Sequence, residues 1–198
     1  RKTTSEKAEA TAAVAVADHM LVMLKELNSR EQVFFSLAGH SYSLGDGRTA
    51  RLWGSVLDMG RTRRKRPHYH ALQMVNDVLS GDLIRTTHSG DDPTWSVSNM
   101  NRVTYNGAHH LQSFAFSDSA RRGLILFNLH RTSALDVRFS GINAPSGTVT
   151  MRRLTSASIT DNNESADVVA PVIQTLPGFN PGQPFSLPPF SMTLLQWT

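Results

Sequence analysis

The sequence contains no cysteine, which excludes disulfide bridges, thiolate metal ligands and a cysteine nucleophile. It also lacks an apolar run near the ~20 residues that a membrane-spanning helix needs. The longest candidate, residues 8–27, is interrupted by five ionisable side chains, namely Glu9, Asp18, His19, Lys25 and Glu26. The absence of cysteine fits a cytoplasmic protein but does not exclude a secreted or periplasmic bacterial one, and the sequence shows no signal-peptide pattern. Because the chain starts at Arg1 and not at methionine, we interpret it as part of a longer polypeptide.

Several motifs of catalysis and cofactor binding are missing too. The sequence has no Gly-x-Ser-x-Gly elbow of serine hydrolases, no phosphate-binding glycine loop and no His-Glu-x-x-His zinc motif. Its 8 histidines include His68 and His70 at an expected helix start, where a spacing of two diverges, and His109 and His110, which would point to opposite faces of a strand. We therefore expect neither a metal nor a cofactor.

Positive charge is concentrated in one run, Arg61–Arg66, which contributes much of the net charge of +4. The simplest interpretation is a solvated loop. A weaker alternative is contact with nucleic acid, which needs a basic surface. No aromatic platform or RNA-binding signature accompanies the run, so we expect no nucleic-acid partner and no membrane partner.

Apolar residues recur at helical spacing in the first part of the chain. The spacing predicts a helix over residues 6–27, with Thr4 or Ser5 as the N-cap and an apolar stripe of Ala13, Ala17, Met20, Leu24 and Leu27. The continuous apolar run Gln32–Leu37 predicts a strand covered on both faces.

A polar, glycine-rich loop is expected at residues 39–47, followed by a short strand or helical turn at Leu52–Leu57. A second helix is predicted from Pro67, a residue favoured at the first helical position. Its apolar face would comprise Ala71, Leu72, Val75, Val78 and Leu79, and Gly81 is the expected C-cap.

From Asp82 onward the apolar period changes to two. Strands are predicted at 83–87, 109–117, 123–129, 135–139 and 148–154, and two more in the terminal stretch 185–197. Prolines at 171, 177, 181 and 184 make the intervening segment a poor helix. Short strands without intervening helices favour an antiparallel sandwich, in which Trp95 and Trp197 would pack in the core or at an edge.

Two regions follow from this change of period. Residues 1–80 read helix, strand, loop, helix, which is typical of the last elements of an alternating β/α domain, and residues 81–198 read as an all-β sandwich domain. The fold class expected for the chain is α+β.

Three stretches carry a family resemblance: Arg66–Asn76 as a last barrel helix, Leu124–Leu129 as a sandwich strand that often holds an asparagine, and the terminal Leu187–Thr193. Together they resemble the C-terminal part of retaining glycoside hydrolases with a (β/α)8 barrel followed by a β-sandwich. The α-L-arabinofuranosidase, β-xylosidase and glucuronidase/heparanase-like families are the most similar.

This resemblance implies a retaining mechanism with two glutamates about 5 Å apart. It implies that both lie upstream of Arg1, so that no catalytic residue is in this chain. The acids that are present would lie away from the active site. An outer helix would carry Glu6, Glu9 and Glu26, Glu31 would precede a strand at the end opposite the active face, and Glu164 would lie in a sandwich loop. Active sites of such barrels form at the C-terminal ends of the strands, which the loop after residue 37 would reach.

His40, Tyr42 and Trp53 are therefore the candidates for lining a sugar subsite, and local loop packing is the alternative role for them. The implied partners are the N-terminal remainder of the same enzyme and a carbohydrate substrate. The alternative function is a non-catalytic carbohydrate-binding or structural sandwich module.

Overall fold

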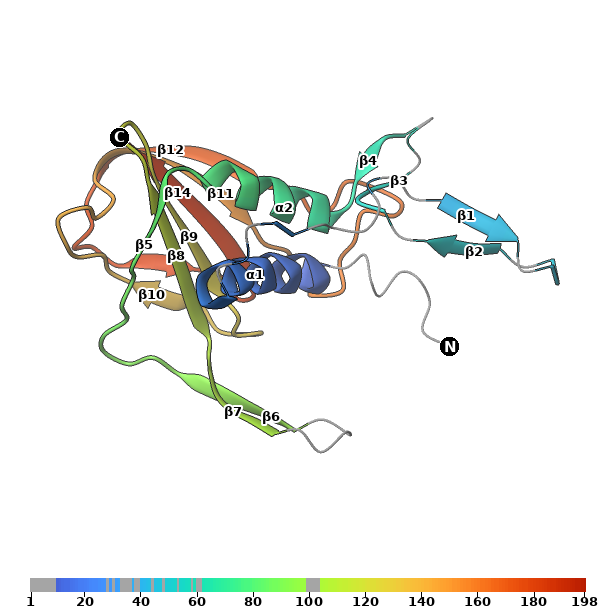
Figure 1. Cartoon of the computed structure of the whole chain (residues 1–198), viewed down its shortest axis with the longest axis horizontal. Helices are drawn as coiled ribbons and strands as arrows, with labels where there is room; N and C mark the ends of the chain where they lie inside the picture. Colours follow the sequence, from blue (N-terminus) through green and yellow to red (C-terminus); the bar gives the residue numbers. More distant parts are fainter. Residues whose placement is uncertain are drawn as a thin grey trace. The chain divides into compact units, whose positions relative to one another are not determined.

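A computed structural model of the protein describes residues 10–198 apart from 28, 30, 33–36, 38, 39, 44, 48, 53, 58, 60, 61 and 99–103; for residues 40–42 and 49–52 it describes the backbone only. This part of the chain contains two helices and fourteen strands (Figure 1). It forms two compact units: the first comprises Arg1–Asp77 and Leu154–Val172, and the second comprises Val78–Arg153 and Ile173–Thr198. The sequence places the boundary at residues 80 and 81, and it does not indicate that residues 154–172 return to the first unit.

Helix α1, Ala10–Leu27, is the first element that the structure describes. Its buried residues are Ala10, Ala13, Val14, Ala17 and Leu21. The predicted stripe is thus right at Ala13 and Ala17 and wrong at Leu27, which is 65% exposed. The first turn is held by the returning segment, because the Ala10 and Thr11 backbone N–H groups donate to the carbonyls of Asp161 (2.8 Å) and Ile159 (3.2 Å). The expected N-cap, Thr4 or Ser5, lies outside the described residues.

Helix α2, Pro67–Val78, begins at the predicted proline. Ala71, Val75 and Val78 are buried as expected, and Leu79 is exposed because the helix has already ended. None of the described helices is long and apolar enough to cross a membrane.

Two short hairpins occupy the stretch between the helices. Strand β1 (His40–Ser43) pairs with β2 (Thr49–Leu52), and β3 (Val56–Leu57) pairs with β4 (Arg64–Lys65), both antiparallel. The loop expected at 39–47 is therefore wrong for residues 40–43, which form a strand. Most of the strand predicted at Gln32–Leu37 lies outside the described residues.

A six-stranded sheet, ordered β12-β11-β14-β9-β8-β5, is the framework of the second unit (Figure 1). Its strands are β5 (Asp82–Ile84), β8 (Leu111–Ser117), β9 (Arg122–Asn128), β11 (Gly147–Leu154), β12 (Val172–Phe179) and β14 (Ser191–Trp197). Two more strands, β10 (Leu135–Val137) and β13 (Phe185–Leu187), form a separate antiparallel pair.

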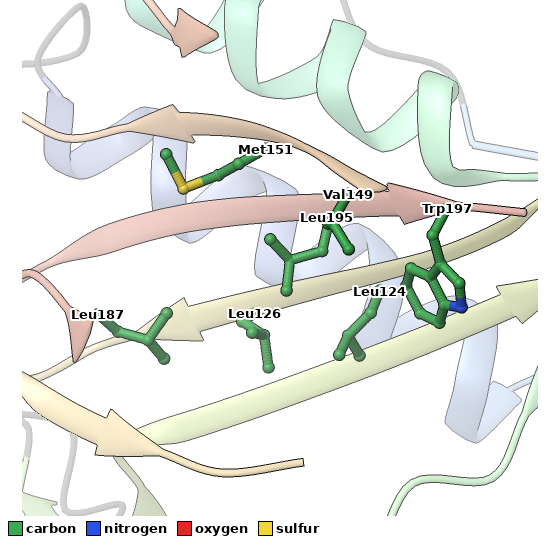
Figure 2. Packing of buried hydrophobic residues seen from close by; sticks show 7 residues of the cluster. All are labelled: Leu124, Leu126, Val149, Met151, Leu187, Leu195 and Trp197. Carbon is green, nitrogen blue, oxygen red and sulfur yellow. The ribbon is translucent and has the colours of Figure 1, made fainter. Parts of the chain in front are cut away.

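The sandwich core lies between this pair and one face of the sheet. Figure 2 shows its buried side chains, which come mainly from alternate positions of β9, β11 and β14: Leu124, Leu126, Val149, Met151, Leu187, Leu195 and Trp197. Three phenylalanines, Phe139, Phe179 and Phe185, pack against it with ring centroids 5.6 to 6.0 Å apart. The α+β class and the sandwich are thus observed, whereas the barrel stays a prediction.

Two features of the second unit differ from the predicted elements. The strand expected at 109–117 is divided at His110 into β7 (Thr104–His109) and β8, and β7 pairs instead with β6 (Thr94–Ser98). We call the β6–β7 pair the ribbon; it extends away from the six-stranded sheet (Figure 1). Gly81 is not the cap of α2, which ends three residues earlier; it adopts φ of 65° in the turn into β5. A Cβ there would lie 2.1 Å from the Ser117 carbonyl oxygen.

Candidate functional site

The structure does not describe the side chains of the three predicted sugar-binding residues. His40 and Tyr42 lie in β1, where they are paired in register with Leu52 and Ala50. The side chains of His40 and Tyr42, and the whole of Trp53, lie outside the part of the chain that the structure describes. A sugar subsite at these three residues stays a prediction.

Glu164 is the acid most firmly engaged by the first unit. Its two carboxylate oxygens accept hydrogen bonds from Nε of Arg66 (2.6 Å) and from Nη2 of the same guanidinium (3.1 Å). Arg66 is only 3% exposed and also donates to the Gly54 carbonyl at 2.8 Å. A bidentate pair of this kind is a strong charge-assisted contact, so Glu164 is a structural group with both oxygens engaged. It belongs to the first unit and not to a sandwich loop as expected.

The basic run is more structured than a solvated loop. Besides Arg66, Arg64 donates to the backbone carbonyl of Glu164 (2.9 Å) and pairs with Asp167 (3.5 Å). The Lys65 ammonium lies 4.8 Å from the Tyr69 ring centroid, within the range of a cation–π contact. The expectation of a solvated loop is therefore wrong for Arg64 and Arg66, because the segment 161–169 supplies partners that are distant in sequence. Lys65 stays exposed.

Asn163 orders that partner segment. Its side chain is fully buried, and Nδ2 donates to the carbonyls of Lys65 (2.8 Å) and Val169 (2.7 Å), while Oδ1 accepts from the N–H groups of Val168 and Val169. Every hydrogen-bonding capacity of a buried amide is thereby used. The loop carrying Glu164 is consequently fixed on the strand that carries Arg64.

Two titratable groups of the first unit have strongly shifted pKa values. Burial, supported by the Arg66 charge, lowers the pKa of His68 to about 4. Burial raises the pKa of Asp18 on α1 to about 6. His68 and Asp18 do not supply the two cooperating carboxyl groups that retaining glycoside hydrolysis needs, since only one of them is a carboxyl group. Among the described residues, no group of three or more His, Asp and Glu side chains is arranged to hold a metal ion.

A network of histidines and an aspartate lies at the base of the ribbon. Asp92 Oδ2 contacts Nδ1 of His109 at 2.9 Å and Nδ1 of His88 at 3.3 Å. Nε2 of His88 is 2.8 Å from the Ser113 hydroxyl, which donates to the Thr86 hydroxyl. Since a carboxylate only accepts hydrogen bonds, both Nδ1 atoms carry protons in these contacts. The network fixes the segment ahead of the ribbon against β8.

Beside this network, three rings stack in sequence. The Trp95 and His110 ring centroids are 6.4 Å apart with planes inclined by 30°, and those of His110 and His130 are 4.6 Å apart with planes inclined by 45°. Burial is the main cause that lowers the pKa of His110, and the neighbouring His130 acts in the same direction. The backbone N–H groups of Thr132 and Ser133 both approach His130 Nδ1, at 3.3 and 2.9 Å, so His130 carries its proton on Nε2.

Asn128 anchors the loop that bears His130. It is fully buried at the end of β9, and its Nδ2 donates to the carbonyls of Ser133, Leu187 and Pro188 at 2.9 to 3.0 Å. Its Oδ1 accepts the His130 N–H at 2.9 Å. The asparagine singled out in the sequence is therefore an organising residue of the sandwich, and its position supports the ring stack.

Sequence reasoning missed the ring stack and the Asp92 network. Trp95 was expected to pack in the core or at an edge, but 40% of it is exposed on the ribbon, whereas Trp197 is buried as predicted. The available signal was the adjacent pair His109 and His110, whose side chains take different partners. They do not do so as neighbours in one strand, because β7 ends at His109 and His110 lies between β7 and β8. The aspartate and His130 lie too far along the chain for a local motif to reveal them.

No protein-family model matches the sequence, and no curated protein matches it. Solved structures do match in fold. A family 51 α-L-arabinofuranosidase from Bifidobacterium longum superposes with a TM-score of 0.68 over 96% of this chain and 35% of that chain, at 15% identity. A thermostable family 51 α-L-arabinofuranosidase from Thermotoga petrophila gives 0.62 over 73% of this chain and 31% of that chain, at 19% identity.

A family 30 subfamily 8 xylanase from Clostridium acetobutylicum gives a TM-score of 0.58 over 95% of this chain and 39% of that chain, at 12% identity. The chain thus spans about a third of the length of the structures it matches. The resemblance to glycoside hydrolases expected from the sequence is confirmed at the level of the fold.

Proposed function

We propose that this chain is the C-terminal segment of a glycoside hydrolase that cleaves glycosidic bonds of polysaccharides or oligosaccharides by a retaining two-carboxylate mechanism. The observation that carries the proposal is the superposition of 96% of the chain on about a third of a family 51 α-L-arabinofuranosidase. In this proposal the first unit supplies the last elements of a (β/α)8 barrel, and the second unit is the accessory sandwich.

The catalytic glutamates are proposed to lie in a polypeptide that precedes Arg1. The bonding of two described acids supports this. Both carboxylate oxygens of Glu164 accept hydrogen bonds from Arg66, and Asp161 accepts hydrogen bonds from the Ser156 hydroxyl and the Ser158 N–H. The chain would act as part of a longer protein or of a two-chain enzyme, with the barrel remainder as its partner. By itself it would be inactive.

The test compares the chain alone with a polypeptide that continues into the residues encoded ahead of Arg1. Aryl α-L-arabinofuranosides and aryl β-D-xylosides are the substrates, and the anomeric configuration of the first product is followed by NMR. We expect no turnover by the chain alone and turnover with retention by the longer protein, or by the chain mixed with the separate upstream part.

Two results would contradict the proposal. One is hydrolysis by the chain alone that disappears on Glu164→Gln or Asp18→Asn, which would place a catalytic acid inside the chain. The other is a longer protein that hydrolyses no glycoside although both parts are folded.

A further inference from the structure

We infer that the exposed face of Trp95, at the base of the ribbon, binds a neutral oligosaccharide chain at a second site, separate from bond cleavage. The inference rests on the proposed function in so far as that function supplies a carbohydrate as the ligand class. It uses no residue of the first unit, where the catalytic end of the barrel is proposed to lie.

The indole of Trp95 is held rigidly from one side. His110 packs against it at a centroid distance of 6.4 Å, and His130 packs against His110 at 4.6 Å. His130 is fixed in turn by two backbone N–H groups and by the Asn128 anchor. An exposed aromatic ring whose conformation is already set loses little side-chain entropy when a ligand covers it.

The remaining 40% of Trp95 is open, which is unusual for a residue with so much apolar surface. The ring offers a flat apolar surface of the size of one sugar ring, whose C–H groups present a matching apolar face. The β-bulge between Trp95 and Val97 alters the ribbon at this position, and bulges commonly re-aim side chains.

Polar groups for sugar hydroxyls lie next to the indole. Tyr105 is directly opposite Val97, which shares a face of β6 with Trp95, and Tyr105 is 61% exposed, so its hydroxyl is available on the same face as the indole. An aromatic platform with a few oriented polar side chains is the usual composition of a small-molecule site.

The charge of the ribbon favours a neutral ligand. None of the described residues in β6 or β7 is Asp, Glu, Lys or Arg; the two strands carry Thr, Ser, Asn and Tyr hydroxyls and amides between their apolar residues. Binding of a nucleic acid depends on cations that neutralise phosphates, which these strands do not supply. Hydroxyl and amide groups beside an indole match a polyhydroxylated, uncharged chain.

Titration calorimetry of the full 198-residue chain with xylohexaose, arabinohexaose and cellohexaose tests the inference. We expect saturable binding of at least one of them with a dissociation constant below about 1 mM. Trp95→Ala should weaken it at least about tenfold, as truncation of a dominant contact residue does. Trp95→Phe should retain part of the affinity, and Tyr105→Phe, which removes only the hydroxyl, should weaken binding without abolishing it.

Ile142→Ala is the matched control, because Ile142 is a fully exposed apolar residue of the same unit with no place in the site. It should leave the affinity unchanged, and circular dichroism should show that each variant is folded. The inference is overturned if none of the three oligosaccharides gives saturation, or if Trp95→Ala and Ile142→Ala bind equally. It is also overturned if Trp95→Ala instead converts a dimer into a monomer in sedimentation, since the ribbon would then be an interface between copies.

The two proposals fail in different ways. If the chain does not bind these oligosaccharides but restores glycosidase activity to the upstream part, only the Trp95 site is refuted. If the chain binds them through Trp95 but the protein extended ahead of Arg1 hydrolyses no glycoside, the Trp95 site is supported and the chain is a binding module.

Discussion

His68 should make the first unit sensitive to mild acid. It is 2% exposed in the first turn of α2, and burial together with the positive charge of Arg66 lowers its pKa from 6.5 to about 4. Between a pH of about 4 and 6.5, the His68 imidazole is therefore neutral in the folded state and protonated in the unfolded chain. Stability from this group is fully present above a pH of about 6.5 and is lost as the pH falls toward about 4.

The magnitude follows from the two pKa values. At a pH of about 5, the unfolded chain is nearly fully protonated at His68, whereas the folded chain carries about a tenth of a proton. The proton-binding factor 1 + 10^(pKa − pH) is about 30 times larger for the unfolded chain than for the folded chain. This ratio corresponds to about 2 kcal/mol in the free energy of unfolding. At a pH of about 8 His68 is neutral in both states and this loss of stability is absent.

Urea denaturation followed by the helical circular dichroism signal measures this effect at both pH values. His68→Gln removes the titrating group but keeps a donor for the Gly54 carbonyl. The change in unfolding free energy between the two pH values should be about 2 kcal/mol smaller in the variant. Gln73→Ala, at an exposed and uncharged position of the same helix, is the control and should keep the full change. Equal pH dependence in the wild-type chain and His68→Gln would refute the reasoning.

Four further substitutions test the packing, each by the free energy of unfolding in urea. Gly81→Ala should cost about 3 kcal/mol or more, because it combines positive φ with a Cβ clash, while Gly90→Ala, with positive φ and open space, should cost about 1 kcal/mol. Asn128→Ala should cost about 3 kcal/mol, because buried carbonyls lose their donors. Glu164→Gln should cost about 2 to 4 kcal/mol, because it leaves the guanidinium of Arg66 buried and unpaired. A loss below about 0.5 kcal/mol would contradict each of the three larger expectations.

Elements with a strong apolar period were predictable from the sequence. The second helix begins at Pro67 as predicted because proline suits the first helical position and Ala71, Val75 and Val78 share one face. Strands β9 and β14 were predictable because they are apolar runs whose side chains are buried at nearly every position. In these segments, burial dictates which residue types each position accepts.

Strands without that constraint were missed. Strand β12 contains Pro177, which argues against a central strand; the structure places it at the edge of the sheet, where a missing N–H is tolerated. The ribbon was missed because both of its faces are largely exposed, so neither shows an alternation of apolar and polar residues.

The candidate site was less predictable than the fold. Asn128 was singled out only as part of an apolar strand, and Trp95, His109 and His110 were named without a role in a site. The contact between His88 and Ser113 spans 25 residues, and the pair of Arg66 and Glu164 spans 98, so no local pattern reports either. Such partners become visible only when the strands that carry them are placed in one sheet or one unit.

The return of residues 154–172 to the first unit has a consequence for synthesis on the ribosome. Glu164 emerges 98 residues after Arg66, a delay of about 5 to 20 s at ordinary rates of translation. During that interval the nascent first unit holds an arginine with no counter-ion and a helix whose opening amides lack acceptors. Folding of the first unit should therefore wait until residues 154–172 have emerged, and a chaperone that shelters the nascent α1 and α2 would act in this window.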